Sequence, residues 1–382
     1  MKKLRWQILV ILLTMVVVGV LLVAQEPGQT LFVPQPTTGG VYTEGLVGSM
    51  TRLNPLLDTD NPADRDINRL LFSGLVRFDD RGLPLPDLAE SWGTSLDGTT
   101  YNFSLRPTAI WHDGQPVTSQ DVAFTIDLIR SGASFFPQDV VALWQSIEVK
   151  ILNDKTIQFI LPEPFAPFLD YLTFGILPSH LLSAIPPADL PNAEFNLRPV
   201  GSGPYKFDSL VIENGQIAGV VLTLFDQYYG QKPYVEQIVL RYYPDSASAF
   251  RAYRQGEVLA ISHITNDVLP EALAEPNLSL YSSRLPQLGM VLLNLKNPEA
   301  PFLQETAVRR ALLLGLNRQY MINTLLQGQG IVADGPIFPG TWAYYEGIEH
   351  LDYNPEAAIE LLKNAGYIIP AAGGQVRAKE ET

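Results

Sequence analysis

The most regular part of the chain is the segment 97–130. Large side chains first recur at every second residue and then follow the spacing of a helix. Every second residue of 99–105 is large or β-branched, which predicts a half-buried strand. Asp-Gly pairs at 97–98 and 113–114 predict tight turns on either side, because Gly supplies a positive φ. Thr118 stands three residues before Asp121, a spacing typical of a capping box at the start of an apolar helix. The segment is expected to form a strand, a turn and a capped helix.

Comparable patterns elsewhere predict many short elements of both kinds. Thirty Pro and 29 Gly among the 382 residues indicate frequent turns, and this length suits two or three domains. Strands are expected at residues 41–47, 147–151, 156–161, 220–224, 238–242 and 287–295, and helices at 67–78, 165–172, 249–256 and 302–326.

The first 24 residues are strongly apolar behind a positive flank. Three basic residues among the first five precede an apolar run over 6–24, which is near the length needed to cross a bilayer. A cleaved signal peptide and an uncleaved signal anchor both fit this pattern. We favour the anchor, because signal peptides have a shorter apolar stretch and cleavage at its end would put Leu22 where a small residue is preferred. The rest of the chain is expected on the outer face of the cytoplasmic membrane, or in the periplasmic or extracellular space.

Charge and composition exclude several kinds of function. The net charge of −14 has the wrong sign for neutralising phosphates, so no nucleic acid is expected as a partner. The absence of cysteine excludes disulfides, thiolate catalysis and lipid attachment through an N-terminal cysteine. Four histidines and no Gly-x-Ser-x-Gly pattern argue against a secreted hydrolase. The isolated His180 is expected to start a helix or to pack rather than to bind a metal.

The regular segment also carries a recognisable series of residues. It reads Asp-Gly-Thr-Thr-Tyr-Asn-Phe-Ser-Leu-Arg over 97–106, then Trp-His-Asp-Gly-Gln-Pro-Val-Thr-Ser-Gln-Asp-Val-Ala-Phe over 111–124. This resembles the signature of the extracytoplasmic solute-binding proteins of peptide and nickel ABC importers, the oligopeptide-binding-protein family (family 5). The resemblance continues to the C-terminus and implies a helix over 353–367. Two departures are Leu259 and Asn317, which stand where the family has Asp; at Asn317 the change is expected to weaken a helix cap or ion pair.

The resemblance implies an α/β, two-lobed fold like that of type II periplasmic binding proteins, with an extra subdomain in the first lobe. It implies capture of a peptide or similar small solute by a monomer and delivery to ABC transporter permease subunits, with no catalytic residues, metal or cofactor. The family continues for another long stretch, so the second lobe is expected to be incomplete. A membrane-anchored sensor or a truncated remnant of the family is the alternative. The expected parts are residues 1–24 (signal anchor or signal peptide), 25–40 (linker), 41–81 with 199–285 (first lobe), 82–198 (subdomain) and 286–382 (second lobe).

Candidate solute-binding residues come from three places. The loop after the first strand lies at the carboxyl end of that strand, where open α/β sheets meet ligands, although a plain turn explains it equally well. The expected strand 287–295 opens the second lobe in the family. Large rings on the loop after Pro339 suit ligand anchoring, and burial between domains is an equal alternative. Trp111 is expected to be structural. The candidates are Ser49, Met50, Thr51, Gln287, Asn294, Trp342 and Tyr345.

Overall fold

The computed structural model describes residues 6, 12–19, 37–283, 285, 287–369 and 378–379. Contacts between backbones divide the chain into two units, residues 1–39 and 40–382. Residues 12–19 of the first unit are helical. Within the described part of the chain, no helix has both the length and the apolar character required to cross a membrane. Most of the predicted anchor and linker lies outside the described residues.

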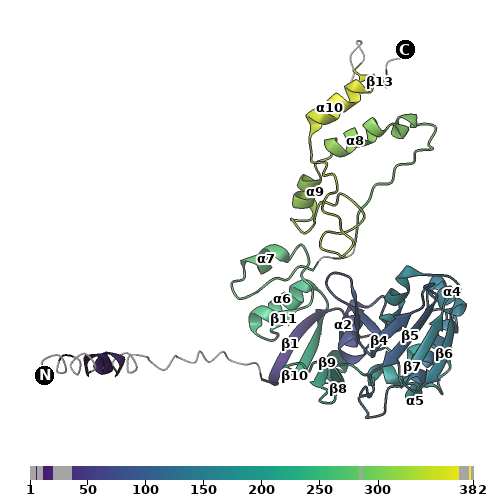
Figure 1. Cartoon of the computed structure of the whole chain (residues 1–382), viewed down its shortest axis with the longest axis vertical. Coiled ribbons are helices and arrows are strands. Elements are labelled where there is room, and N and C mark those ends of the chain that lie inside the picture. Colours follow the sequence, from purple (N-terminus) through teal and green to yellow (C-terminus); the bar gives the residue numbers. More distant parts are fainter. Residues whose placement is uncertain are drawn as a thin grey trace. The chain divides into compact units, whose positions relative to one another are not determined.

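The first sheet combines the N-terminal strand with strands that come much later in the sequence (Figure 1). Its order is β11-β1-β10-β9-β8; β1 pairs in parallel with β11, and β8, β9 and β10 form an antiparallel meander. Asn214 and Gly215 join β8 to β9 with φ values of 52° and 77°, the left-handed geometry that a two-residue hairpin requires. The bounds are β1 Gly39–Val47, β8 Tyr205–Glu213, β9 Gln216–Leu224, β10 Val235–Tyr243 and β11 Ala260–Ile261.

The second sheet contains the regular segment of the sequence. Four antiparallel strands run in the order β4-β5-β7-β6, and a separate short pair is formed by β2 and β3. The expected strand, turn and capped helix are confirmed as β5, the Asp113–Gly114 turn and α3. The bounds are β2 Val76–Phe78, β3 Pro84–Pro86, β4 Ala89–Thr94, β5 Thr100–Leu105, β6 Glu148–Asn153, β7 Thr156–Ile160, α3 Ser119–Arg130, α4 Gln138–Ser146, η1 Ala166–Leu172, α5 Ser179–Leu182, η2 Pro187–Asn192 and η3 Glu194–Leu197.

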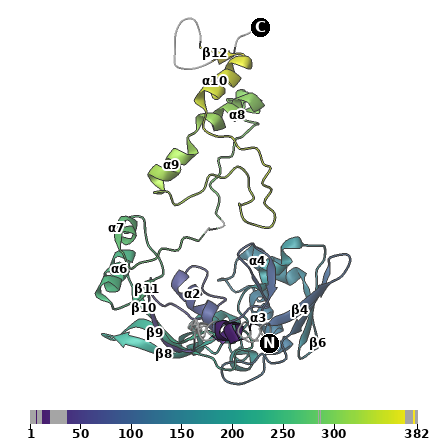
Figure 2. The same ribbon diagram turned by 60° about the vertical axis from the view of Figure 1, so that its left-hand side comes forward.

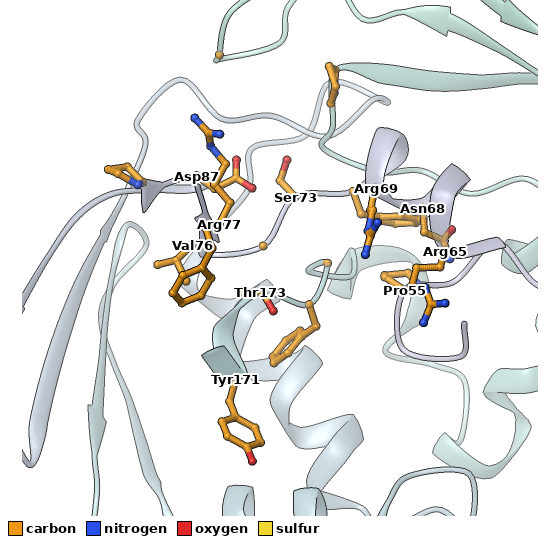
Figure 3. Close-up of a pocket in the computed structure, with 18 of the residues that line it drawn as sticks. Pro55, Arg65, Asn68, Arg69, Ser73, Val76, Arg77, Asp87, Tyr171 and Thr173 are labelled. Atoms are coloured by element: carbon orange, nitrogen blue, oxygen red, sulfur yellow. The ribbon is translucent and has the colours of Figure 1, made fainter. Parts of the chain in front are cut away.

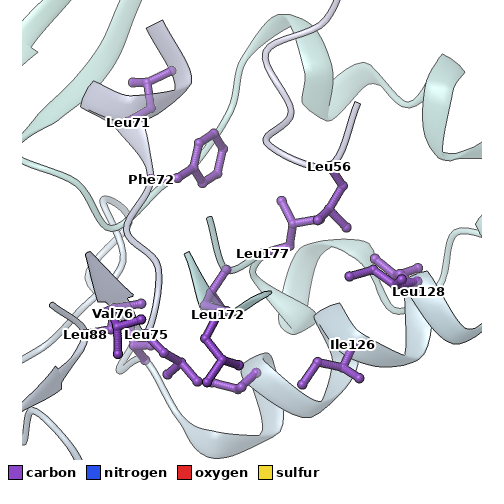
Figure 4. Packing of buried hydrophobic residues seen from close by; sticks show 14 of the residues in the cluster. Leu56, Leu71, Phe72, Leu75, Val76, Leu88, Ile126, Leu128, Leu172 and Leu177 are labelled. Carbon is purple, nitrogen blue, oxygen red and sulfur yellow. The ribbon is translucent and has the colours of Figure 1, made fainter. Parts of the chain in front are cut away.

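One apolar core connects the two sheets. Helix α2, Pro62–Leu71, lies between them in both views (Figures 1 and 2) and buries Ile67 and Leu71 completely. The same cluster includes Leu222 of β9 and Phe103 of β5, so side chains of both sheets pack into a continuous interior. Figure 4 shows its central part, where Leu75 and Leu172 approach each other below α2.

The expected helix 67–78 is wrong in its bounds. Asn61 caps α2 by accepting hydrogen bonds from the backbone N–H groups of Ala63 and Asp64, and Pro62 occupies the first turn, so the helix begins earlier. The helix ends at Leu71, and residues 76–78 form β2 by pairing with β3. Pairing with a strand that comes later in the sequence therefore overrides the helical spacing of residues 71–78.

Residues beyond β11 form mainly helices and irregular chain. Val308 and Ala311 of α8 are buried, as is Ala358 of α10, and these two helices pack together. The bounds are α6 Ser246–Gln255, α7 Leu269–Ala274, η4 Pro301–Gln304, α8 Thr306–Gly315, α9 Arg318–Leu325, α10 Pro355–Asn364, β12 Tyr367–Ile368 and β13 Ala378–Lys379.

Two expectations for this region are wrong. Residues 287–295 form no strand: among the described residues nothing pairs with them, and Val291 and Leu292 are 84% and 86% exposed. The expected helix 302–326 is divided, because the backbone turns extended at Leu316. Asn317 then begins α9, and its Oδ1 accepts a hydrogen bond of 2.9 Å from the backbone N–H of Tyr320. Asn317 therefore caps a helix, and the expected weakening of this cap relative to Asp stays a prediction.

Candidate functional site

An open hollow of about 1100 Å³ lies where α2, the segments 73–78 and 170–175, and the loop 228–233 meet (Figure 3). Its walls mix basic, acidic and aromatic side chains, a composition suited to a solute with both charged and apolar parts. These residues are the arginines 65, 69, 77 and 106, the aspartates 58, 87 and 170, and Phe72, Phe78, Trp144, Tyr171, Phe174, Tyr228 and Tyr229.

One end of the hollow is organised around the carboxylate of Asp87. The Tyr229 hydroxyl donates to Asp87 Oδ1 at 2.5 Å. Arg106 Nε donates to the Asp87 backbone carbonyl at 2.6 Å, and its guanidinium lies 5.3 Å from the centre of the Tyr229 ring. Burial raises the pKa of Asp87, and burial followed by the charge of Asp87 raises the pKa of Tyr229, so the tyrosine keeps its proton and stays a donor.

Arg77 of β2 faces the same carboxylate. Its charge acts to lower the pKa of Asp87, which places the two groups within electrostatic reach of each other, and Figure 3 shows them at one end of the hollow. Among the described residues, no hydrogen bond or ion pair holds the Arg77 guanidinium, and the residue is exposed. Arg77 is therefore a cation available to a solute.

The other end is built on α2. Asn68 Nδ2 donates to Asp58 Oδ2 at 2.9 Å. Burial raises the pKa of Asp58, while this hydrogen bond and the charges of Arg65 and Arg69 act in the opposite direction. Asn68 is only 2% exposed, yet its Oδ1 has no hydrogen-bond partner in the described part of the chain. A buried acceptor without a donor is unfavourable, so Asn68 Oδ1 is an unsatisfied polar atom in the wall of the hollow.

The predicted loop after β1 is held against the start of α2. Asn61 Nδ2 donates to the carbonyl of Ser49 and to Thr51 Oγ1, both at 2.8 Å. The backbone N–H groups of Thr51 and Arg52 donate to Asp64 Oδ2 at 2.9 and 2.7 Å. Burial raises the pKa of Asp64 to about 6, against the lowering effect of these donors. The loop is thus a well-connected turn that leaves the side chains of Ser49 and Thr51 exposed.

The remaining predicted residues are spread over the chain. Met50 packs against the main core, Gln287 and Asn294 lie exposed on the irregular segment 287–295, and Trp342 and Tyr345 are 64% and 74% exposed. None of the seven candidates lines the hollow. Their role in binding stays a prediction.

The signature segment makes contacts that join parts of the scaffold. Trp111 is fully buried. His112 accepts from the backbone N–H of Gly201 through Nδ1 at 3.1 Å and lies 3.1 Å through Nε2 from the carbonyl of Gly203, and burial lowers its pKa to about 4. Asp113 Oδ2 lies 2.7 Å from His180 Nε2, so His180 contributes a contact between the turn and α5. No cluster of metal-ligating side chains occurs within the described ranges.

Sequence reasoning missed the residues of the hollow. Arg77, Asp87, Asn68 and Tyr229 are far apart in the sequence and follow no periodic pattern, so nothing at the sequence level brings them together. The one available signal was the adjacent pair of large rings at 228–229 in a polar loop, since aromatic residues in such loops suit ligand contact.

Comparison with known proteins decides the family. Residues 84–382 match the family model described as bacterial extracellular solute-binding proteins, family 5 Middle. The chain belongs to this family. Its members are extracytoplasmic, and the two-lobed mixed α/β fold expected from the sequence is confirmed by solved structures of the family. The contacts of the signature segment described above therefore belong to the scaffold of a solute-binding fold.

Several relatives show the range of the family. A protein of Brucella ovis named as an ABC transporter peptide-binding protein is 34% identical over 87% of this chain, and the Escherichia coli dipeptide-binding protein is 29% identical over 84%. The chain spans 61% and 62% of their lengths. The structure of NikZ from Campylobacter jejuni with Ni(L-His) is 28% identical, with a TM-score of 0.62 over 91% of this chain and 66% of NikZ. AppA from Bacillus subtilis with a nonapeptide is 27% identical, with a TM-score of 0.62 over 91% and 68%.

Proposed function

We propose that this chain captures a peptide or similar small solute outside the cytoplasmic membrane for delivery to the permease subunits of an ABC-type importer. The observation that carries the proposal is the family match over residues 84–382, which includes the whole signature segment. Relatives named for dipeptide, oligopeptide and nickel binding support a solute of this size. The chain acts here by binding, without a chemical step, as a monomer.

We also propose the division into lobes that the sequence predicts. Strand β1 and strands β8 to β11 share one sheet, which supports a first lobe made of 41–81 and 199–285. Strands β4 to β7 form their own sheet, which supports a subdomain at 82–198, and 286–382 then belongs to the second lobe. The hollow takes residues from both parts of the first lobe and from the subdomain, so all three would contact one solute.

The attachment of the protein to the cytoplasmic membrane is a separate proposal. The apolar run over 6–24 supports attachment to the membrane through the N-terminus. A membrane-anchored chain that keeps residues 1–24 sediments with membranes after cell lysis and resists extraction by salt. A mature N-terminus near Gln25 in the soluble fraction would contradict the anchor while leaving solute capture intact.

Solute capture is tested by calorimetric titration of the full chain in detergent. The probes are a dipeptide, a nonapeptide and the Ni(L-His) complex, which represent the ligands named for relatives and structural neighbours. We expect saturable binding of one probe class with one site per chain, and a rise of the melting temperature with probe concentration. Absence of binding by all three classes, together with no copurifying solute in native mass spectrometry, would refute the proposal.

Delivery to a permease is the part that separates a transport protein from a sensor that kept the fold. A transport component restores solute uptake when it is supplied together with its permease in cells that lack their own binding protein. A chain that binds solute and fails to restore uptake with any family 5 permease supports the sensor alternative.

A further inference from the structure

We infer that the hollow binds the carboxylate of its solute through Arg77, so that the chain selects solutes with a free carboxylate group beside an aromatic or apolar body. This inference rests on the proposed function, because it identifies the chemistry of the solute captured there. None of the residues predicted from the sequence belongs to this subsite.

The charges at the Asp87 end favour an anion. Arg77, Arg106 and Asp87 all line the hollow, and the charges of both arginines act to lower the pKa of Asp87, so two cations lie within electrostatic reach of one carboxylate. Arg106 is committed to the scaffold, since its Nε bonds the Asp87 carbonyl and its guanidinium lies over the Tyr229 ring. The Asp87 carboxylate already accepts from Tyr229. The remaining positive charge therefore resides on Arg77, whose guanidinium is without a hydrogen bond or ion pair in the described part of the chain.

The geometry of a guanidinium favours a carboxylate as its partner. Its N–H groups lie in one plane and match the two oxygens of a carboxylate, which makes a pair of parallel charge-assisted hydrogen bonds. The two other arginines near α2 are less available: Arg65 Nη1 lies 3.4 Å from the carbonyl of Thr59, and Arg69 Nη1 lies 3.8 Å from Asp66. Arg77 is thus the cation of the hollow that a solute can engage without breaking an existing contact.

The rest of the hollow defines what accompanies the carboxylate. Phe72, Tyr171 and Phe174 also line the hollow and provide apolar and aromatic surface. At the far end, the buried Asn68 Oδ1 has no donor. A solute that carries an aromatic body beside a carboxylate would match the rings and the free guanidinium of this lining, which is a pattern found in a short peptide with an aromatic residue.

The test compares two probes that differ only in the carboxylate. The tripeptide Ala-Phe-Ala and its C-terminal amide are titrated calorimetrically into the full chain, the R77Q variant and the matched control R254Q. Arg77 and Arg254 are both exposed arginines, and Arg254 lies in the last turn of α6, away from the hollow. We expect wild type and R254Q to prefer the acid about tenfold or more, which corresponds to about 1.4 kcal/mol, and R77Q to bind both probes alike.

Each other outcome overturns the inference. Equal binding of the acid and the amide by wild type would show that the carboxylate is not recognised, and the proposal of solute capture would be unaffected. A second contrary outcome is that R77Q weakens the binding of the acid and of the amide to the same degree at an unchanged melting temperature. That result would show that Arg77 contributes to solute binding without recognising the carboxylate. If wild type binds neither tripeptide, the inference fails, and the broader panel of dipeptide, nonapeptide and nickel complex decides separately whether solute capture fails as well.

Discussion

Replacing Trp111 by Ala should remove one of the largest groups from the core. Its side chain is fully buried, and its ring centre lies 6.4 Å from that of His180. Its indole Nε1 is 3.4 Å from Asp121 Oδ2, which is too long for a strong hydrogen bond, so the contribution of Trp111 comes mainly from packing. The perturbation is therefore a test of the apolar interior beneath α3.

The expected loss follows from the buried area. A large aromatic side chain buries about 150–250 Å², and about 25 cal/mol for each Å² gives about 4–6 kcal/mol for complete burial. Ala keeps part of this contribution and the cavity relaxes in part, so the measured range for such deletions is about 3–5 kcal/mol. We expect Trp111→Ala to lower the free energy of unfolding by this amount.

The measurement is urea unfolding followed by far-ultraviolet circular dichroism, with Trp342→Ala as the matched control. Trp342 is 64% exposed, so its replacement should change the free energy by no more than about 0.5 kcal/mol. The folded fraction of the Trp111 variant should bind solute with wild-type affinity. A loss below about 1 kcal/mol at an unchanged urea slope, or loss of binding without loss of stability, would refute the structural role.

Three further changes test other contacts. Burial lowers the pKa of His112 from its ordinary 6.5 to about 4 in the folded chain. The free energy of unfolding should therefore fall as the pH drops from 6.5 to 4, because only the unfolded chain binds the proton there. The non-titrating His112→Gln variant should lose less stability over that range, and an equal pH dependence of the two proteins would contradict this. Gly201→Ala should destabilise the chain by about 1–3 kcal/mol or more, because the added Cβ would overlap the carbonyl of Leu71, whereas Gly93→Ala meets open space and should melt near wild type. Asn317→Ala should weaken α9 by about 1 kcal/mol, seen as faster amide hydrogen exchange; unchanged exchange would show that the cap is dispensable.

Sequence patterns predicted elements well where local chemistry and tertiary structure agree. The strand, turn and capped helix over 97–130 were predicted because alternation, Asp-Gly turns and the Thr118–Asp121 spacing act within a few residues of one another; Thr118 N–H donates to Asp121 Oδ2 at 2.8 Å. The end of α6 at Gly256 was predicted for the same reason, since its φ of 76° lies in the left-handed region that favours glycine. The hairpin signal Asn214–Gly215 was equally local, yet the strand before it was not predicted.

Errors arose where distant residues decide the local structure. Residues 76–78 leave a helical pattern because β3 pairs with them, and 287–295 stay irregular because nothing in the described part of the chain pairs with their apolar pattern. The hollow is the extreme case. Asp58, Arg77, Asp87 and Tyr229 come from four separate loops or short elements, and no spacing rule connects them.

This contrast explains why the family was easier to predict than the solute. The signature residues act on the backbone of other segments: His112 contacts Gly201 and Gly203, and Asp113 contacts His180. The His112 contacts connect the subdomain to the segment that leads into β8, and the Asp113 contact connects two parts of the subdomain. None of these contacts involves the solute, so they can stay the same while specificity varies. Around the hollow, Asp87 and Arg106 also make scaffold contacts. Arg77, whose guanidinium makes no hydrogen bond or ion pair within the described part of the chain, can change without disturbing the fold. The identity of the solute should therefore be sought in the charges of the hollow rather than in the signature.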